Sequence, residues 1–192
     1  VMPFSSESSE IVEKLNSAGK EMIIHMPMES KTGDPSWVGD KAVFTSMSDD
    51  EIKNLVNEAF SIVKYAKGLN NHMGSKIMED DRALNTVIAT LAQNNLFFLD
   101  SKTTAESNAE NLCKNNNVCL LNRDVFLDSS DDINYIKSRL QKTAQIAQKN
   151  GYAIAIGHVG PEGGKITAQA INDLCPEMEK SGIQFVTLST LC

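Results

Sequence analysis

The fold is decided by the stretch SDDEIKNLVNEAFSIVKYAKGLNNHMGS, residues 48–75, in which an amphipathic segment leads into a short apolar run. Ser48 and Glu51 fit a capping box, where each side chain satisfies an amide at the start of a helix. Apolar residues then recur at helical spacing as far as about Tyr65, namely Ile52, Leu55, Val56, Ala59, Ile62 and Val63. Gly68-Leu69-Asn70-Asn71 follows as a weak strand, so the stretch predicts one helix–strand unit.

The same alternation continues on both sides of this unit. Further strands are expected at residues 22–24, 96–99, 118–121, 152–156 and 183–188. Further helices are expected before Asn94-Asn95, after a second capping box at Ser107–Glu110, over residues 132–149, and before Ser181-Gly182. Strands that alternate with helices predict βαβ units and a parallel sheet.

The number of units favours an incomplete barrel. A closed (β/α) barrel usually needs about 250 residues and eight units. Here six strands are expected in 192 residues, and Val1-Met2 adds a fragment of a seventh. We therefore expect an α/β fold: a distorted or incomplete (β/α) barrel of about seven parallel strands with outer helices. Its first strand or strands would be missing, and residues 1–192 would form a single domain. An open doubly wound sheet is the alternative.

Composition excludes some classes of protein. The net charge of −7 and the absence of a Lys/Arg run argue against nucleic-acid binding, which needs a clustered basic face. No apolar stretch reaches the length that crosses a bilayer, so no transmembrane segment is expected. The four cysteines form no C-x-x-C pair and do not demand disulfides, and we expect Cys119 to be a small core residue within an apolar run.

All three histidines of the chain follow expected strands. His25 follows Ile23-Ile24, His72 follows the weak strand, and His158 follows Ile156-Gly157. The carboxyl ends of parallel strands are where function collects in α/β proteins. Neutral imidazole is the commonest metal ligand in proteins, and catalytic zinc keeps about three protein ligands plus a position for water. The histidines therefore predict a metal-dependent hydrolytic site, with Asp100 and Asp128 as candidate carboxylates.

Structural interpretations stay open for several of these residues. His25 could be a hydrogen-bonded core residue, Asp100 could be an N-cap, and Arg123 could form a structural ion pair with a nearby Asp. Asn70 and Asn71 could simply shape a turn. Trp37 could cover the core or form a platform on which a sugar ring stacks, and its position in a Gly/Pro loop favours the cover.

Five blocks in order resemble the divergent polysaccharide deacetylase family over essentially the whole chain. They are His25-Met26-Pro27-Met28-Glu29, Asn70-Asn71-His72-Met73-Gly74-Ser75, Leu99-Asp100-Ser101, Arg123-Asp124-Val125-Phe126-Leu127-Asp128 and Ile156-Gly157-His158. The resemblance implies a distorted barrel related to NodB-type carbohydrate esterases, which remove acetyl groups from polysaccharides with a divalent metal, usually zinc. It also implies export to the cell envelope and a glycan partner.

Two features depart from that wider group. The Asp pair expected at the end of its first strand is absent from this chain. Its closely spaced His-x-x-x-His pair is absent as well, because His25 and His72 are 47 positions apart.

We therefore expect a hydrolase that acts on a non-peptide carbon–nitrogen bond and removes acetyl groups from an amino-sugar polysaccharide. His25 and His72 would bind the metal, completed by an Asp from the missing strand or by Asp100. His158 would protonate the leaving amine and Arg123 would orient a carboxylate. The expected catalytic set is His158, Asp100, Arg123 and Asp128, and the expected substrate-binding set is Asn70, Asn71, Ser75 and Ser101.

Two other functions fit the same sequence. A non-catalytic carbohydrate-binding or envelope-assembly protein would bind glycan in the same pocket without turnover. A metal-dependent amidase would act on peptide and release amino acids instead of acetate.

Overall fold

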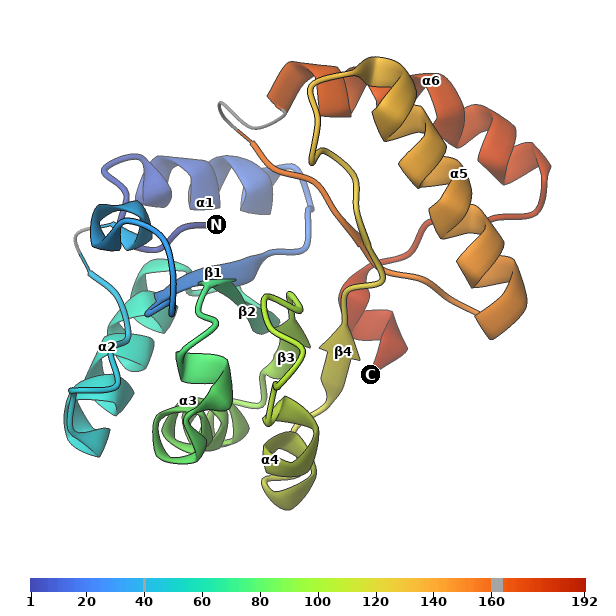
Figure 1. Cartoon of the computed structure of the whole chain (residues 1–192). Coiled ribbons are helices and arrows are strands. Elements are labelled where there is room, and N and C mark those ends of the chain that lie inside the picture. The colour runs from blue at the N-terminus through green and yellow to red at the C-terminus, as the bar shows by residue number, and fades with distance from the viewer. Residues whose placement is uncertain (40, 160–163) are drawn as a thin grey trace. The chain divides into compact units, whose positions relative to one another are not determined.

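The described part of the chain contains six helices and six short strands in a computed structural model, and a helix separates successive strands except the fourth and fifth (Figure 1). The structure describes residues 1–39, 41–159 and 164–192. It divides the chain into two compact units. Unit 1 comprises Val1–Leu121 and Thr187–Cys192, and unit 2 comprises Asn122–Val186.

Unit 1 contains four of the helices and a four-stranded parallel sheet in the order β1-β2-β3-β4. The register pairs Ile23 with Gly68 and runs to Met28 with Met73, and Gly68 also pairs with Phe97. The elements are α1 (Ser8–Ser17), β1 (Ile23–Met28), α2 (Asp49–Ile62), β2 (Gly68–Met73), α3 (Asp81–Gln93), β3 (Phe97–Asp100), α4 (Ala109–Asn115) and β4 (Leu120–Asn122), with 3-10 turns η1 (Pro35–Val38), η2 (Ile77–Glu79) and η3 (Leu188–Leu191).

One face of this sheet forms the main core. Successive side chains of a strand point to opposite faces, and Ile24, Met26 and Met28 of β1 are all fully buried in one cluster. Residues of α2 and α3 complete that cluster, and α2, α3 and α4 lie side by side along the sheet (Figure 1). The opposite face of β1 is therefore available for polar side chains.

The first capping box is confirmed at the start of α2. The Ser48 hydroxyl accepts from the Glu51 amide, and the Glu51 carboxylate accepts from the Ser48 amide at 2.8 Å. The second capping box is wrong, because Asn108 is the N-cap of α4 and makes no side-chain cap bond. The Ser107 hydroxyl donates to Asp100 instead.

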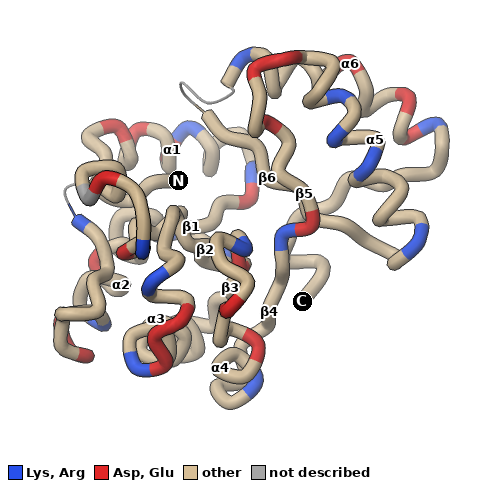
Figure 2. The backbone as a smooth tube through the Cα atoms, viewed as in Figure 1, with Lys and Arg blue, Asp and Glu red and all other residues tan. Residues whose placement is uncertain are grey.

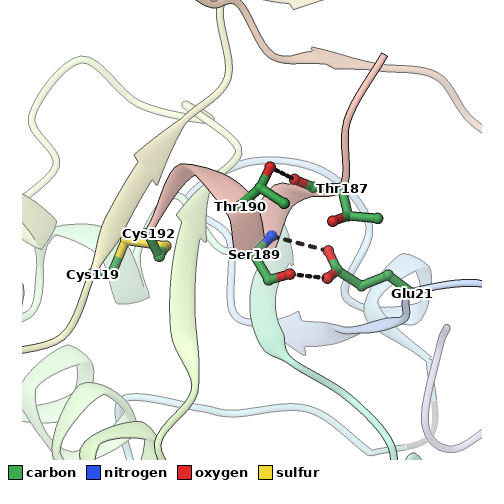
Figure 3. The surroundings of a disulfide bond; sticks show 6 residues. All are labelled: Glu21, Cys119, Thr187, Ser189, Thr190 and Cys192. Carbon is green, nitrogen blue, oxygen red and sulfur yellow. Dashed lines mark hydrogen bonds between the residues drawn. A yellow bond between two sulfur atoms is a disulfide. The ribbon is translucent and has the colours of Figure 1, made fainter. Parts of the chain in front are cut away.

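The C-terminal segment of unit 1 is attached to the sheet by a disulfide (Figure 3). Cys119, directly before β4, is bonded to Cys192, 73 positions away. Beside it, the Ser189 amide and hydroxyl both donate to the Glu21 carboxylate (Figure 3). The expectation that Cys119 is a small core residue is therefore wrong. Cys113 and Cys175 are free.

Unit 2 contains two helices and a two-stranded parallel sheet. Val125 pairs with Ala155 and Phe126 with Ile156. The elements are β5 (Val125–Phe126), α5 (Ile133–Asn150), β6 (Ala155–Ile156) and α6 (Gly164–Lys180). A separate small core holds the unit together, made of Val125, Leu127, Ile136, Leu140, Ala170 and Met178.

The parallel α/β architecture agrees with the sequence prediction, whereas seven strands are not observed. The described residues contain six strands, and residues 183–187 lie outside any strand. Phe185 and Val186 of that run are exposed, so it lacks the two-sided burial of a central parallel strand. The barrel and the single domain stay predictions.

Acidic and basic residues are interspersed in both units (Figure 2). Several form exposed pairs such as Lys41 with Glu58 at 2.5 Å, and pairs of this kind stabilise a fold by roughly 0–1 kcal/mol. Among the residues described, no helix combines the length and the apolar character needed to cross a bilayer.

Candidate functional site

Strands β1 and β2 place His25, Asn70 and His72 on one face of the sheet. In the parallel register His25 lies opposite Asn70, and Pro27 lies opposite His72. Because side chains alternate along a strand, His25 points away from the core face that Ile24 and Met26 occupy. The expectation that His25 ends its strand is wrong, since β1 continues to Met28.

The two imidazoles form the centre of a hydrogen-bonded chain. His25 Nδ1 lies 3.0 Å from Asn70 Oδ1, and His25 Nε2 lies 3.1 Å from His72 Nδ1. His72 Nε2 lies 3.2 Å from the carbonyl oxygen of Trp37. The rings meet edge to face, with centroids 4.9 Å apart. We call His25 and His72 the imidazole pair.

The amide of Asn70 fixes which nitrogen of His25 carries hydrogen. Asn70 Nδ2 donates to the Ser101 hydroxyl at 3.0 Å, and that hydroxyl donates to the carbonyl of Asn71 at 2.9 Å. The amide oxygen of Asn70 therefore faces His25, and His25 Nδ1 must donate to it. This leaves Nε2 of neutral His25 with its lone pair toward His72.

The contacts of the imidazole pair depend on the tautomers of the two rings. If the hydrogen of His72 lies on Nδ1, that nitrogen donates to His25 Nε2. If it lies on Nε2, that nitrogen donates to the Trp37 carbonyl, and His25 Nε2 and His72 Nδ1 turn lone pairs toward each other. The second arrangement would suit a cation between the two nitrogens.

The separation of the two facing nitrogens is compatible with two ligands of one metal ion. Two nitrogens that bind one tetrahedral zinc ion at about 2.0–2.1 Å lie roughly 3.3 Å apart, close to the 3.1 Å between His25 Nε2 and His72 Nδ1. A ligating histidine usually donates its other N–H to a carboxylate, backbone carbonyl or water, and His72 has such a carbonyl at Trp37. Within the described ranges, however, no group of three His, Cys, Asp or Glu side chains could hold a metal ion.

The buried side-chain amide of Asn71 fixes the backbone next to the imidazole pair. Asn71 Oδ1 accepts from the Ser101 amide at 2.9 Å, and Asn71 Nδ2 donates to the Met73 carbonyl and the Thr103 hydroxyl. Met73 and Gly74 both have positive φ, and a Cβ at Gly74 would lie 2.9 Å from Cβ of Met28. Asn71 thus holds the turn after β2. Asn71 and Ser101 are buried, so their contacts favour a structural role over the predicted substrate binding.

Asp100 is buried completely and acts on the loop that follows β3. Its Oδ1 accepts from the Lys102 amide at 2.6 Å, and its Oδ2 accepts from the Ser107 hydroxyl at 2.7 Å. These contacts resemble a cap, the structural interpretation of this residue. Ser75, by contrast, is half-buried and its hydroxyl lies 2.7 Å from that of Ser30.

Unit 2 contains a second cluster, in which a carboxylate orients His158. Asp128 Oδ1 lies 2.7 Å from His158 Nδ1, and Asp128 Oδ2 accepts from the His158 amide at 2.6 Å and from the Thr167 hydroxyl at 2.9 Å. A Cβ at Gly157 would lie 2.8 Å from Cγ2 of Thr167, so a larger residue there would have to displace the Thr167 side chain. Because Asp128 is an acceptor, His158 Nδ1 carries hydrogen and Nε2 can accept or deliver a proton.

Arg123 packs on an aromatic ring of the same unit. Its guanidinium carbon lies 3.6 Å from the centroid of the Phe126 ring, a cation–π geometry. Phe126 also approaches His158, with ring centroids 5.5 Å apart. The predicted role of Arg123 in orienting a carboxylate stays a prediction.

Sequence reasoning misjudged Trp37. The residue is 67% exposed, so the prediction that it covers the core is wrong. It lies in η1, whose first turn is capped by Asp34 Oδ1 accepting from the Ser36 amide at 2.8 Å. Its carbonyl is part of the site, which no pattern of side chains could reveal.

The comparisons with known proteins agree with the sequence blocks. The sequence model of the divergent polysaccharide deacetylase family matches residues 1–192. The chain is 33% identical over 178 residues to the uncharacterized protein YibQ of Escherichia coli, covering 93% of this chain and 55% of YibQ. It is 32% identical over 171 residues to an uncharacterized protein of Haemophilus influenzae, covering 89% of this chain and 60% of that protein. The chain thus spans less than two thirds of these relatives.

A solved structure shares the fold. The crystal structure of an uncharacterized protein from Agrobacterium tumefaciens superposes with a TM-score of 0.86 at 19% identity. The match covers 100% of this chain and 86% of that one. At this identity the likeness supports the fold alone.

Proposed function

Because this chain belongs to the divergent polysaccharide deacetylase family, we propose that it is a zinc-dependent hydrolase that removes acetyl groups from an amino-sugar polysaccharide of the cell envelope. The observation that carries the proposal is the facing contact between His25 Nε2 and His72 Nδ1, whose separation of 3.1 Å suits two ligands of one metal ion. A cation between these nitrogens would be held by the lone pairs of both rings.

In this proposal His25 binds the metal through Nε2 and His72 through Nδ1. Asn70 and the Trp37 carbonyl hold the two rings in the required tautomers. Catalytic zinc takes about three protein ligands, so the proposal requires one ligand in addition to the two histidines, for which we expect a carboxylate.

The reaction consumes one water and yields acetate and a free amine. Zinc, when bound, polarises the acetyl carbonyl and lowers the pKa of water. The water oxygen bonds to the carbonyl carbon, the carbon–nitrogen bond breaks, and the nitrogen takes up a proton. That proton balances the one that the water gives up. Within unit 2, His158 stays the predicted general acid, with its Nδ1–H held by Asp128.

The test is the metal content and acetate release of the full-length protein and its variants. His72→Ala should lose stoichiometric zinc and release no acetate from an N-acetylglucosamine oligomer, because one of the facing nitrogens is gone. His158→Gln is the matched control: it removes an imidazole of unit 2 and should keep zinc at the wild-type level. Circular dichroism verifies that His72→Ala is folded. Unchanged zinc content and acetate release in the folded variant would contradict the proposal.

A glycan-binding protein without turnover is the second candidate. It is favoured by the lack of a third metal ligand among the residues that the structure describes. This candidate predicts that the full-length wild-type protein binds the oligomer but contains no zinc and releases no acetate.

We also propose that the protein works in an oxidising compartment of the cell envelope. The Cys119–Cys192 disulfide supports this, because disulfides persist in such compartments and are rare in the cytosol. Thiol alkylation of protein taken directly from cells tests it. After denaturation, peptide mapping should find Cys113 and Cys175 alkylated and Cys119 and Cys192 protected. Alkylation of Cys119 and Cys192 would contradict the proposal.

A further inference from the structure

The most exposed aromatic side chain among the described residues stands beside the imidazole pair. Trp37 is 67% exposed, against 49% for Tyr152 and 48% for Phe185. A large apolar side chain left in solvent is informative when it adjoins a candidate site. Trp37 adjoins one directly, because its own carbonyl oxygen lies 3.2 Å from Nε2 of His72.

The indole is held from one side by backbone. A Cβ at Gly33, which has φ +98°, would lie 3.2 Å from Cε3 and 3.3 Å from Cζ3 of Trp37. It would also lie 3.2 Å from Cε of Met73, the last residue of β2. The six-membered part of the indole therefore rests over Gly33 and is fixed without entering the core.

The chain around Trp37 is also fixed locally. Asp34 caps the turn through the Ser36 amide, and the Gly39 amide donates to the Ser36 carbonyl at 3.1 Å. Tryptophan has only two side-chain torsions, so an aromatic ring in a fixed turn loses little entropy when a ligand binds. Trp37 thus has the properties of a preorganised contact.

We propose that the indole of Trp37 is the subsite on which a pyranose ring of the glycan stacks next to the imidazole pair. A pyranose has apolar C–H groups on its faces and hydroxyls around its rim. The π-face of an indole is negative and attracts the weakly positive hydrogens of C–H groups, while the flat ring buries the sugar's apolar face. The inference rests on the proposed function for the identity of the ligand as an amino-sugar polymer.

Trp37 is the only tryptophan of the chain, so its emission reports on this position alone. The probe is the tetramer of β-1,4-linked N-acetylglucosamine, titrated into the full-length protein, provided that its other segments contribute no tryptophan or have theirs replaced by Phe. Stacking should produce a saturable blue shift of the emission. The titration is run with EDTA as well, so that binding is measured without the metal.

Variants separate the indole from the backbone of the same residue. Trp37→Ala should weaken binding of the tetramer at least tenfold by calorimetry, whereas Trp37→Phe should restore most of it. Trp37→Ala keeps its carbonyl, so zinc content should stay at the wild-type level. Tyr65→Ala is the matched control. Tyr65 is also exposed, but it precedes the amino end of β2, whereas His72 lies near the carboxyl end of that strand.

The two proposals can fail separately. A blue shift with EDTA, in a protein that contains no zinc and releases no acetate, upholds the stacking subsite and rejects the hydrolase. Acetate release with equal KM in wild type and Trp37→Ala rejects the subsite and upholds the hydrolase. No shift at saturating tetramer, or no binding by calorimetry, also overturns the subsite.

Discussion

At the scale of single residues, Asn70 decides whether the imidazole pair can act as a metal site. Its Oδ1 selects the tautomer of His25, and its Nδ2 is held by Ser101. An asparagine between two hydrogen-bonding partners is poorly replaced by an apolar residue, because both partners then lose a bond in a buried place.

We expect Asn70→Leu to weaken zinc binding about 10–100-fold, the usual cost of removing a group that orients a ligand. Asn70→Asp should retain most of the affinity, because a carboxylate still accepts from His25 Nδ1. Competition with a chromogenic chelator measures both. Ser75→Ala is the control, since the Ser75 hydroxyl contacts Ser30 and the Lys31 amide instead of the imidazole pair. Equal affinity in Asn70→Leu and wild type would show that His25 needs no orienting partner.

The sequence predicted part of the arrangement of the histidines. The sequence placed polar residues after strands, and the pairing of His25 with Asn70 follows from parallel neighbours. It could not reveal that β1 extends through His25, because Pro27 interrupts the run and lacks an amide for a ladder bond. The contact of His72 with a backbone carbonyl was equally beyond a sequence pattern, since every residue has one.

At the scale of elements, Glu29 joins the segments that follow β1 and β2. Its carboxylate accepts from the amide and hydroxyl of Thr45, both at 2.7 Å, and from Lys76 Nζ at 2.7 Å. Partial burial raises the pKa of Glu29, but the hydrogen bonds from Lys76 and Thr45 outweigh it and hold the pKa below its ordinary value.

The hydrogen bonds of ionised Glu29 stabilise the folded state. Because the pKa of Glu29 is lowered on folding, this stabilisation is sensitive to acid. It is fully present above the ordinary glutamate pKa of 4.5 and is lost as pH falls through the lower pKa of the folded protein. In Glu29→Gln, the free energy of unfolding should therefore fall less steeply below about pH 4.5 than in wild type. Urea titrations at several pH values measure this. If the free energy of unfolding falls equally steeply below about pH 4.5 in both proteins, Glu29 does not make this contribution.

Helices with strong end signals were predicted well. Helix α2 begins at its capping box, and α5 ends at Gly151, which adopts the left-handed conformation at the C-cap. Helix α1 gave no such signal, because its N-cap Glu7 makes no side-chain cap bond. The apolar run 183–188 was misread as a strand because β-branched residues favour strands only where neighbours pack against them.

At the scale of the whole molecule, the chain leaves unit 1 after Leu121, forms unit 2, and returns to unit 1 at Thr187. The disulfide joins residues on either side of this excursion. A cross-link that closes a loop of this length removes much of the freedom of the unfolded chain.

We expect Cys192→Ser to lower the free energy of unfolding by about 4 kcal/mol, the chain-entropy value for a loop of this size. Thermal unfolding with and without reductant measures the effect. Reductant should lower the Tm of wild type to that of Cys192→Ser and leave the variant unchanged. Cys175→Ser is the control, because Cys175 is a free thiol and its replacement should not alter the response to reductant. A wild-type Tm that does not respond to reductant would contradict the prediction.

The separation of the two bonded cysteines also allows Cys119 to pair wrongly while the protein folds. Two other thiols of this chain, Cys113 and Cys175, lie nearer to Cys119 in sequence than Cys192 does. Burial and the charge of Asp100 raise the pKa of Cys113 to about 12, and burial and the charge of Glu179 raise the pKa of Cys175. A raised pKa lowers the thiolate fraction and makes each of them a poor competitor for Cys119 in the folded protein. Folding thereby favours the bond with Cys192.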